Sequence, residues 1–293
     1  MFAIICVLLE IFMSYAHYSH ILKWSTLALL SYVALVFVAS VDWSKAAYGT
    51  FVPNFTFDSA HAMALVAILG TTISPYLFFW LAGQEVEEQH RRHVKPLCVA
   101  PRRAGAELKR IRMDTLLGMG FSHLTALFIV IATAATLNAH GITNVESSAQ
   151  AAEALRPIAG DFAFALFSLG IIGTGMLAVP ILAGSAAYAV SESFGWVEGL
   201  DRKPREAKAF YATITVATIA GLTLNYIGID PIKALYWAAV VNGILAAPLM
   251  VVMMLISTNS KVMGRLAVSG RLAIGGWIAT IVMGVVAIGF FVI

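Results

Sequence analysis

Long apolar runs separated by short polar connections extend along the whole chain. Most of these runs are close to ~20 residues, the length that an α-helix needs to cross the hydrocarbon core of a bilayer. The pattern predicts an all-α membrane protein with eight transmembrane helices in a single polytopic domain, residues 1–293. The expected spans are approximately 1–16, 24–41, 60–83, 116–137, 161–190, 210–227, 231–256 and 272–293.

The composition supports this class. Of the 293 residues, 60% are hydrophobic and 12% are charged, whereas a soluble domain carries about 25% charged residues. Of the 19 Lys and Arg residues, 16 fall in the loops after the first, third, fifth and seventh expected spans, and the exceptions are Lys45, Arg156 and Lys233. Cytoplasmic loops attract Lys and Arg, so we expect a multi-pass protein of the cell membrane, in bacteria the inner membrane, with its basic loops in the cytoplasm.

The third expected span is interrupted at its centre by the stretch Gly70–Tyr76, which reads Gly-Thr-Thr-Ile-Ser-Pro-Tyr. Pro75 has no backbone N–H and its ring clashes with the preceding turn, so the helix must open just before it. In hydrocarbon, each freed backbone group is costly unless protein, water or a ligand satisfies it. Broken helices form substrate and ion sites in many transporters. The polar residues of the break are therefore candidate substrate-binding residues: Thr71, Thr72, Ser74 and Tyr76.

A simple proline kink is the alternative interpretation of this stretch. In such a kink, the Thr and Ser hydroxyls hydrogen-bond back to the loosened carbonyls, and no ligand is needed.

Three other polar residues fall inside expected spans. Glu10 interrupts the first span and His123 lies about one turn inside the fourth, so both are candidate proton-relay groups, with an interhelical hydrogen bond as the alternative role. Asn242 is the one strongly polar residue of the seventh span. Its amide suits either packing across the bundle or an oxygen contact with a passing cation.

Motifs for catalysis are absent: the chain has no His-Glu-x-x-His, no Gly-x-Ser-x-Gly and no phosphate-binding Gly-Lys-Ser/Thr sequence. We therefore expect no enzyme and no cofactor. Nucleic acid is also excluded as a partner, because the basic loop from Arg91 to Arg112 is explained by an anionic inner leaflet of the lipid bilayer.

The broken span also carries a family resemblance. The stretch Gly70–Phe78, followed by Gln84-Glu85-Val86-Glu87-Glu88, resembles the broken sixth helix of the NRAMP divalent-metal transporters, most closely their NRAMP-related branch. The order of the spans, the basic inner loops and the Gly-rich fifth span are similar to that family's fourth through eleventh helices. The resemblance implies the C-terminal part of a LeuT-type inverted-repeat fold and transport of a divalent cation, coupled to or accompanied by protons.

Two departures from the family pattern change this expectation. In typical members an Ala carbonyl and a Met sulfur of the break bind the metal, and the matching positions here are Thr71 and Ser74. A thioether selects soft transition metals, whereas hydroxyl and carbonyl oxygens suit hard ions such as Mg²⁺ or Mn²⁺. The hypothesis is a shift toward a hard cation, with Thr71 and Ser74 as metal ligands. The family's first helix, with its metal-binding Asp-Pro-Gly-Asn break, has no counterpart in this sequence, so the chain is expected to be a truncated form.

Two other functions fit the same pattern. A carrier of a small organic substrate, of the amino-acid type, would use the helix N-terminus near Tyr76 to hold a carboxylate. A non-transporting remnant would only pack in the membrane or pair with another subunit.

Overall fold

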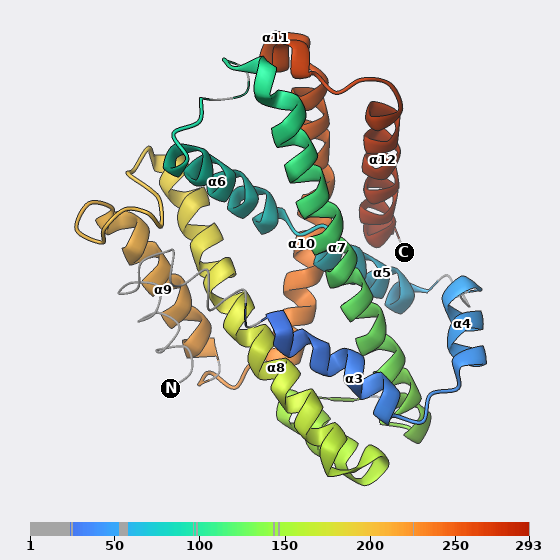
Figure 1. Ribbon diagram of the computed structural model, residues 1–293. Helices are drawn as coiled ribbons and strands as arrows, with labels where there is room; N and C mark the ends of the chain where they lie inside the picture. The colour runs from blue at the N-terminus through green and yellow to red at the C-terminus, as the bar shows by residue number, and fades with distance from the viewer. Residues whose placement is uncertain are drawn as a thin grey trace. The chain divides into compact units, whose positions relative to one another are not determined.

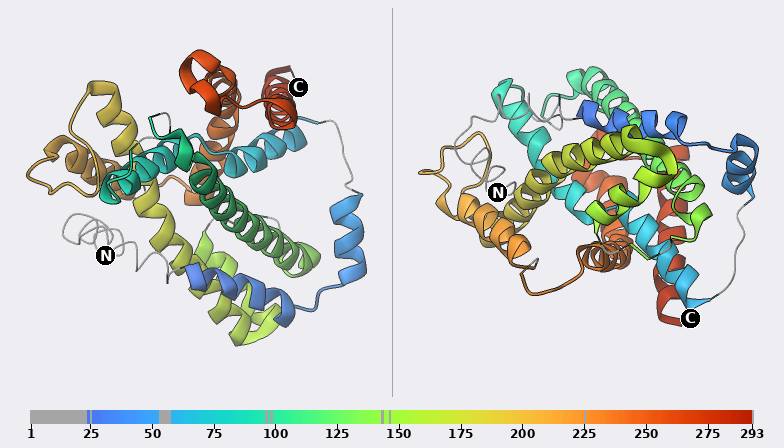
Figure 2. Two further views of the ribbon diagram at one scale, coloured as in Figure 1. Left: turned by 45° about the horizontal axis from the view of Figure 1, so that its top comes forward. Right: turned by 90° about the horizontal axis from the view of Figure 1, so that it is seen from below.

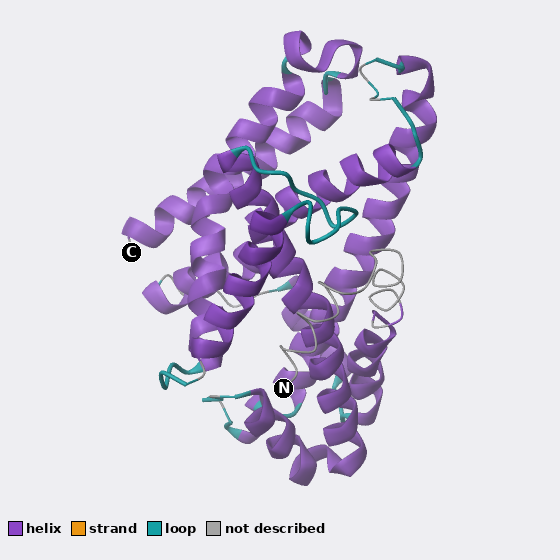
Figure 3. Ribbon diagram, turned by 90° about the vertical axis from the view of Figure 1, so that its left-hand side faces the viewer, coloured by secondary structure: helices purple, strands orange, loops and turns teal. Residues whose placement is uncertain are grey.

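The structure is a computed structural model that describes residues 24, 26–52, 58–95, 97, 99–142, 144–145, 147–224 and 226–292. This part of the chain consists of helices and connecting loops (Figure 3). The expected span 1–16, with Glu10, lies outside the described residues. The helices are η1 (Thr26–Leu29), α3 (Leu30–Val38), α4 (Trp43–Phe51), α5 (Ser59–Thr72), α6 (Pro75–Arg91), η2 (Pro101–Arg103), α7 (Ala104–Ala135), η3 (Asn138–His140), α8 (Ser148–Phe194), α9 (Lys208–Leu224), α10 (Pro231–Thr258), α11 (Ser260–Met263), η4 (Gly264–Leu266) and α12 (Gly270–Val292).

Within the described residues, five helical segments are long and apolar enough to cross a membrane. They correspond to the third, fourth, fifth, seventh and eighth expected spans, so the chain is a multi-pass membrane protein. The other two expected spans within the described residues are shorter than predicted. The helix Thr26–Val38 is followed by α4 at a bend of 117°, and α9 has 17 residues.

Two helices extend beyond their expected limits. The helix α7 begins at Ala104 rather than near residue 116, because its first turns hold strong helix formers such as Glu107 and Lys109, which need no bilayer around them. The helix α8 begins at Ser148, but Gly160 interrupts it with φ 84° and ψ 173°. A positive φ of this kind favours glycine. The second part of α8 therefore begins at Asp161, where the sequence predicts the fifth span.

The described chain divides into two compact units. The first contains residues 1–54 and 118–233, and the second contains residues 55–117 and 234–293. In the first unit α3 and α9 both pack along α8 (Figure 2). Gly170 makes the α3 contact close, because a Cβ there would lie 2.5 Å from the ring of Tyr32. The same ring packs edge-on against Phe167 with centroids 5.9 Å apart.

The second unit has its core between α5, α10 and α12. The buried residues of this core are Val66, Ala67, Ala239 and Val240. Beside them, α5 and α10 touch through backbone atoms. A Cβ at Gly70 would overlap the Ala239 carbonyl and lie 2.5 Å from the Gly243 nitrogen. Only glycine at these positions lets the two helices approach so closely.

An ion-pair cluster joins the end of α6 to the beginning of α7. Arg92 binds both carboxylate oxygens of Glu107, at 3.1 and 3.3 Å. Arg110 donates from Nε to Glu107 at 2.9 Å and from Nη2 to Glu85 at 2.7 Å. Because two arginines share one glutamate, these pairs form a network rather than isolated surface contacts. The network fixes the far end of α6.

The glycine contact between α5 and α10 gives the first testable prediction. We expect Gly70→Ala to lower the free energy of unfolding by about 1–3 kcal/mol, because the added methyl group must push the two backbones apart. Gly284→Ala in α12 is the matched control: a Cβ there meets open space, and alanine is the better helix former. Thermal unfolding in detergent micelles measures both variants. Equal melting temperatures for the two would contradict the close contact.

Candidate functional site

The break that the sequence predicts is confirmed by the backbone of the third span. The helix α5 ends at Thr72 and α6 begins at Pro75, and the two residues between them are not helical. Ile73 has φ −114° and ψ 69°, and Ser74 has φ −84° and ψ 126°. Figure 1 shows the two helices meeting beside α10. The polar residues of the predicted site therefore do surround an interruption in a membrane helix.

The hydroxyl groups of the break hydrogen-bond to carbonyls of the same segment. Ser74, which is 2% exposed, donates to the Gly70 carbonyl at 2.7 Å and also lies 3.1 Å from the Thr71 carbonyl. The hydroxyls of Thr71 and Thr72 both donate to the Ile68 carbonyl, at 2.7 and 2.9 Å. These are the bonds that the proline-kink interpretation expects. Each hydroxyl oxygen keeps lone pairs, so donation does not remove it as an acceptor or ligand.

The hydroxyls do not satisfy every carbonyl that the break releases. The Ile73 nitrogen still bonds to the Leu69 carbonyl at 2.8 Å, but Pro75 has no N–H to offer to the Thr71 carbonyl. The carbonyl of Ile73 accepts no hydrogen bond from the described residues. The break therefore presents a backbone oxygen without a donor, in a segment apolar enough to lie in a membrane.

The two helix ends at the break differ in what they can bind. The C-terminal end of α5 carries the partial negative charge of a helix dipole, and the N-terminal end of α6 carries a partial positive charge. The donors of α6 are reduced, however, because Pro75 occupies its first position and the Leu77 N–H is used by the Ser74 carbonyl at 3.1 Å. The end of α5 thus offers oxygens to a cation, and the first turn of α6 keeps the Tyr76 and Phe78 N–H groups.

Two further predicted residues lie close to the break in the structure. Tyr76 is half-buried in the first turn of α6. Asn242 is half-buried on α10, next to Gly243. A Cβ at Gly243 would overlap the Val66 carbonyl and lie 2.8 Å from the Val66 side chain. Asn242 is therefore on the helix that packs against α5, beside the point of closest approach.

The proton-relay candidates are not brought to the break by any described contact. His123 is exposed on α7, and its Nδ1 bonds to the Met119 carbonyl of the same helix at 2.6 Å. Glu10 lies outside the described residues. In the described part of the chain, no three His, Cys, Asp or Glu side chains gather as a metal site.

The sequence reasoning missed the backbone oxygen of Ile73. It named side chains, because only side chains are visible as residue types. The sequence did contain an indication of this oxygen, because Pro75 has no backbone N–H. The non-helical residues before it take further N–H donors away from the carbonyls of the preceding turn. Carbonyls in the turn before an intramembrane proline can therefore be named as candidate ligands from sequence.

Comparisons with known proteins agree on one family. The family model described as natural resistance-associated macrophage protein-like matches residues 1–293. A divalent metal cation transporter MntH of Caldanaerobacter subterraneus is 30% identical over 81% of this chain and 52% of its own length. Proteins of the same name from Acidiphilium cryptum and Clostridium acetobutylicum are 26% and 23% identical, over 84% and 81% of this chain and 52% and 51% of their own. The chain thus spans about half the length of these curated relatives.

The buried hydroxyl of Ser74 gives the second prediction. We expect Ser74→Ala to lower the free energy of unfolding by about 1–3 kcal/mol, because the Gly70 carbonyl loses its donor in a buried position. Thr71→Ala is the matched control, since Thr71 is exposed and its removal leaves the Thr72 hydroxyl on the same Ile68 carbonyl. We expect this control to stay within about 0.5 kcal/mol of wild type. Denaturation in detergent micelles, followed by helical circular dichroism, makes the comparison. A larger loss for Thr71→Ala would contradict the assignment.

Proposed function

Because the chain belongs to the natural resistance-associated macrophage protein-like family, we propose that it takes part in transport of a divalent metal cation across the membrane. The proposed pathway passes the break between α5 and α6. Three relatives are each named as a divalent metal cation transporter, which supports a divalent metal cation as the transported ion. Because the match covers only about half the length of those relatives, the transport unit is proposed to include spans that this sequence does not contain.

One observation carries the proposal: a backbone carbonyl without a hydrogen-bond donor at the break after α5. The Ile73 carbonyl accepts no bond from the described residues, and a cation would satisfy it. An organic carboxylate would instead need donors from the first turn of α6, where Pro75 offers none and the Leu77 N–H is already used, which leaves the Tyr76 and Phe78 N–H groups. The names of the relatives, rather than this turn, favour a cation over an amino-acid type of substrate. Under the cation proposal the break in the third span has a role in transport. A non-transporting remnant would have no such role for it.

The proposed cargo is a hard divalent cation such as Mg²⁺ or Mn²⁺. The oxygen donors would be the hydroxyls of Thr71 and Ser74 together with the freed carbonyl, with Thr72, Tyr76 and Asn242 beside them. Hard cations take oxygen ligands, and Mg²⁺ keeps several of its waters. A site with few protein ligands and no carboxylate therefore suits a partly hydrated ion better than a stripped one.

The finer architecture is part of the same proposal. We place the chain in the cell membrane, the inner membrane in bacteria, as a single polytopic domain of eight spans with the basic loops in the cytoplasm. These spans would form the C-terminal part of an inverted-repeat fold of the LeuT type. Glu10 and His123 remain candidates for proton coupling.

The third prediction tests the oxygen ligands by changing the chemistry of one of them. Ser74→Cys replaces a hydroxyl by a thiol of similar size, and sulfur prefers soft metals. We expect the affinity for Cd²⁺ relative to Mg²⁺ to rise about tenfold, which corresponds to ~1.4 kcal/mol. Calorimetry measures the binding of each ion to the purified full chain. A second assay measures the uptake of each ion into proteoliposomes that contain the same chain.

Ser185→Cys is the matched control, because Ser185 is another buried serine, 1% exposed, in α8. It adds the same thiol in α8 rather than in the break, so its metal preference should equal that of wild type. A shift of equal size in both variants would show that any added thiol binds Cd²⁺ and would refute Ser74 as a ligand. Binding of an amino acid, with no binding of Mg²⁺ or Mn²⁺ by wild type, would refute the cation proposal itself.

A further inference from the structure

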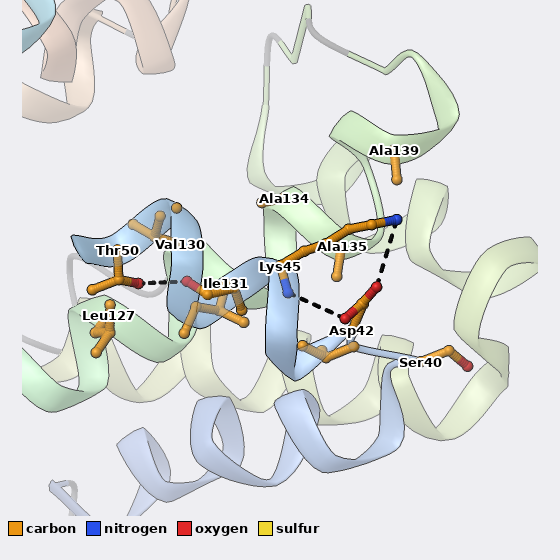
Figure 4. A pocket seen from close by; sticks show the side chains of 13 residues that line it. Ser40, Asp42, Lys45, Thr50, Leu127, Val130, Ile131, Ala134, Ala135 and Ala139 are labelled. Carbon is orange, nitrogen blue, oxygen red and sulfur yellow. Dashed lines mark hydrogen bonds and ion pairs between the residues drawn. The ribbon is translucent and has the colours of Figure 1, made fainter. Parts of the chain in front are cut away.

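A cavity of about 570 Å³ lies in the first unit, between α4 and the C-terminal half of α7. Its volume is within the range of small-molecule pockets, about 300–1,000 Å³. Figure 4 shows that α4 and α7 run alongside each other here, with Thr50 near Leu127 at one end and Asp42 near Ala139 at the other. No residue of the break in the third span lines this cavity.

The two ends of this cavity differ in chemistry. Toward Leu127, its walls are Gly49 of α4 and the apolar side chains of Val130 and Ile131 on α7. The hydroxyl of Thr50 is used within α4, because it donates to the Ala46 carbonyl at 2.7 Å. This end therefore offers mainly apolar walls, and the hydroxyl proton of Thr50 is not available to a ligand.

The other end carries one negative and one positive side chain. Asp42 caps the start of α4 by accepting from the Ser44 and Lys45 nitrogens at 3.1 and 3.2 Å. Lys45 lies 3.5 Å from the same carboxylate, and the two side chains are 54% and 87% exposed. Two such exposed charges hold each other only weakly. Both remain available to a ligand with charges of opposite sign.

The placement of α4 suggests where these charges lie in a membrane. The apolar stretch of α7 ends near Ala135, and the polar residues Asn138 and His140 follow it. The helix α4 buries none of its residues, and it exposes the aromatic side chains of Trp43, Tyr48 and Phe51. Aromatic residues of this kind gather at the boundary between lipid and water. The end of the apolar stretch of α7 therefore supports a position of the charged end near a membrane surface, with the apolar end directed inward.

We propose that this cavity is a binding site for a phospholipid with a zwitterionic ethanolamine headgroup. One acyl chain occupies the apolar end between Gly49 and Val130. The lipid phosphate binds Lys45 and the ammonium group binds Asp42. The headgroup thereby lies at the bilayer surface and the chain lies in hydrocarbon, which is the arrangement of a lipid in its own leaflet.

The paired charges select this lipid over an anionic one. A phosphatidylglycerol headgroup would also reach Lys45, but it carries no cation for Asp42, so the repulsion between its phosphate and that carboxylate would not be offset by an ammonium group. A lipid with both charges matches both side chains. The preference therefore depends on Asp42, and the retention of any lipid depends on the apolar end.

The fourth prediction tests each end with one variant of the full chain. A side chain at Gly49 meets open space in the cavity, so Gly49→Leu should fill the acyl channel without disturbing the helix. We expect this variant to lose the ethanolamine phospholipid that co-purifies with wild type, as measured by native mass spectrometry in detergent. Gly221→Leu in α9 is the matched control: it also adds a side chain in open space, but outside the cavity, and it should keep the lipid.

Asp42→Asn tests the headgroup. Asparagine caps a helix about as well as aspartate, so α4 is kept while the negative charge is removed. We expect the melting temperature of wild type to rise more with added phosphatidylethanolamine than with phosphatidylglycerol, and Asp42→Asn to lose this difference.

Three results would overturn the proposal. One is equal lipid retention by Gly49→Leu and Gly221→Leu. Another is a wild-type preference for phosphatidylglycerol. The third is a change of oligomeric state in Gly49→Leu with its lipid unchanged, which would show that protein rather than lipid fills the cavity. None of these measurements depends on metal transport, so the proposed function can fail without affecting this site.

Discussion

The need to satisfy backbone hydrogen bonds in hydrocarbon is the constraint on which the broken span depends. Pro75 removes one donor, and the chain responds within a few residues: Ser74 turns its hydroxyl to the Gly70 carbonyl at 2.7 Å, and the neighbouring threonines bond to Ile68. The response is incomplete, because the carbonyl of Ile73 has no donor among the described residues. The kink and the ion-site interpretations are therefore not exclusive. The hydroxyls stabilise the break, and the remaining carbonyl is the group that the proposed cation would satisfy.

The close approach of α5 and α10 stabilises the last turns of α5, just before the break. Gly70 and Gly243 bring backbone against backbone, so the last turns of α5 are held by a helix that crosses the membrane by itself. Small residues at such contacts let helices associate without a large apolar side chain between them. The position of Asn242 beside this contact follows from the same packing. The break in the third span thus follows directly after the contact between α5 and α10.

Sequence reasoning predicted what depends on local composition. Pro75 located the break to within two residues, and the start of the second part of α8 at Asp161 agrees with the expected span. It did not predict the extension of α7 to Ala104, because charged helix formers continue a helix in water without an apolar signal. It also could not predict the α4–α7 cavity, since that depends on how two segments far apart in sequence pack. The hydrogen bonds of Ser74 depend on its side-chain rotamer, which residue type alone does not specify.

The ion-pair cluster at the far end of α6 has a mechanical consequence. Arg92 and Arg110 tie the last turns of α6 to the first turns of α7 through Glu107 and Glu85. At its other end α6 is joined to α5 by only Ile73 and Ser74, which have no helical geometry. A rotation of α6 against α5 would therefore have its pivot at these two residues and would carry the beginning of α7 with it. The same residues that free an oxygen for a cation would then serve as the hinge that opens and closes access to it.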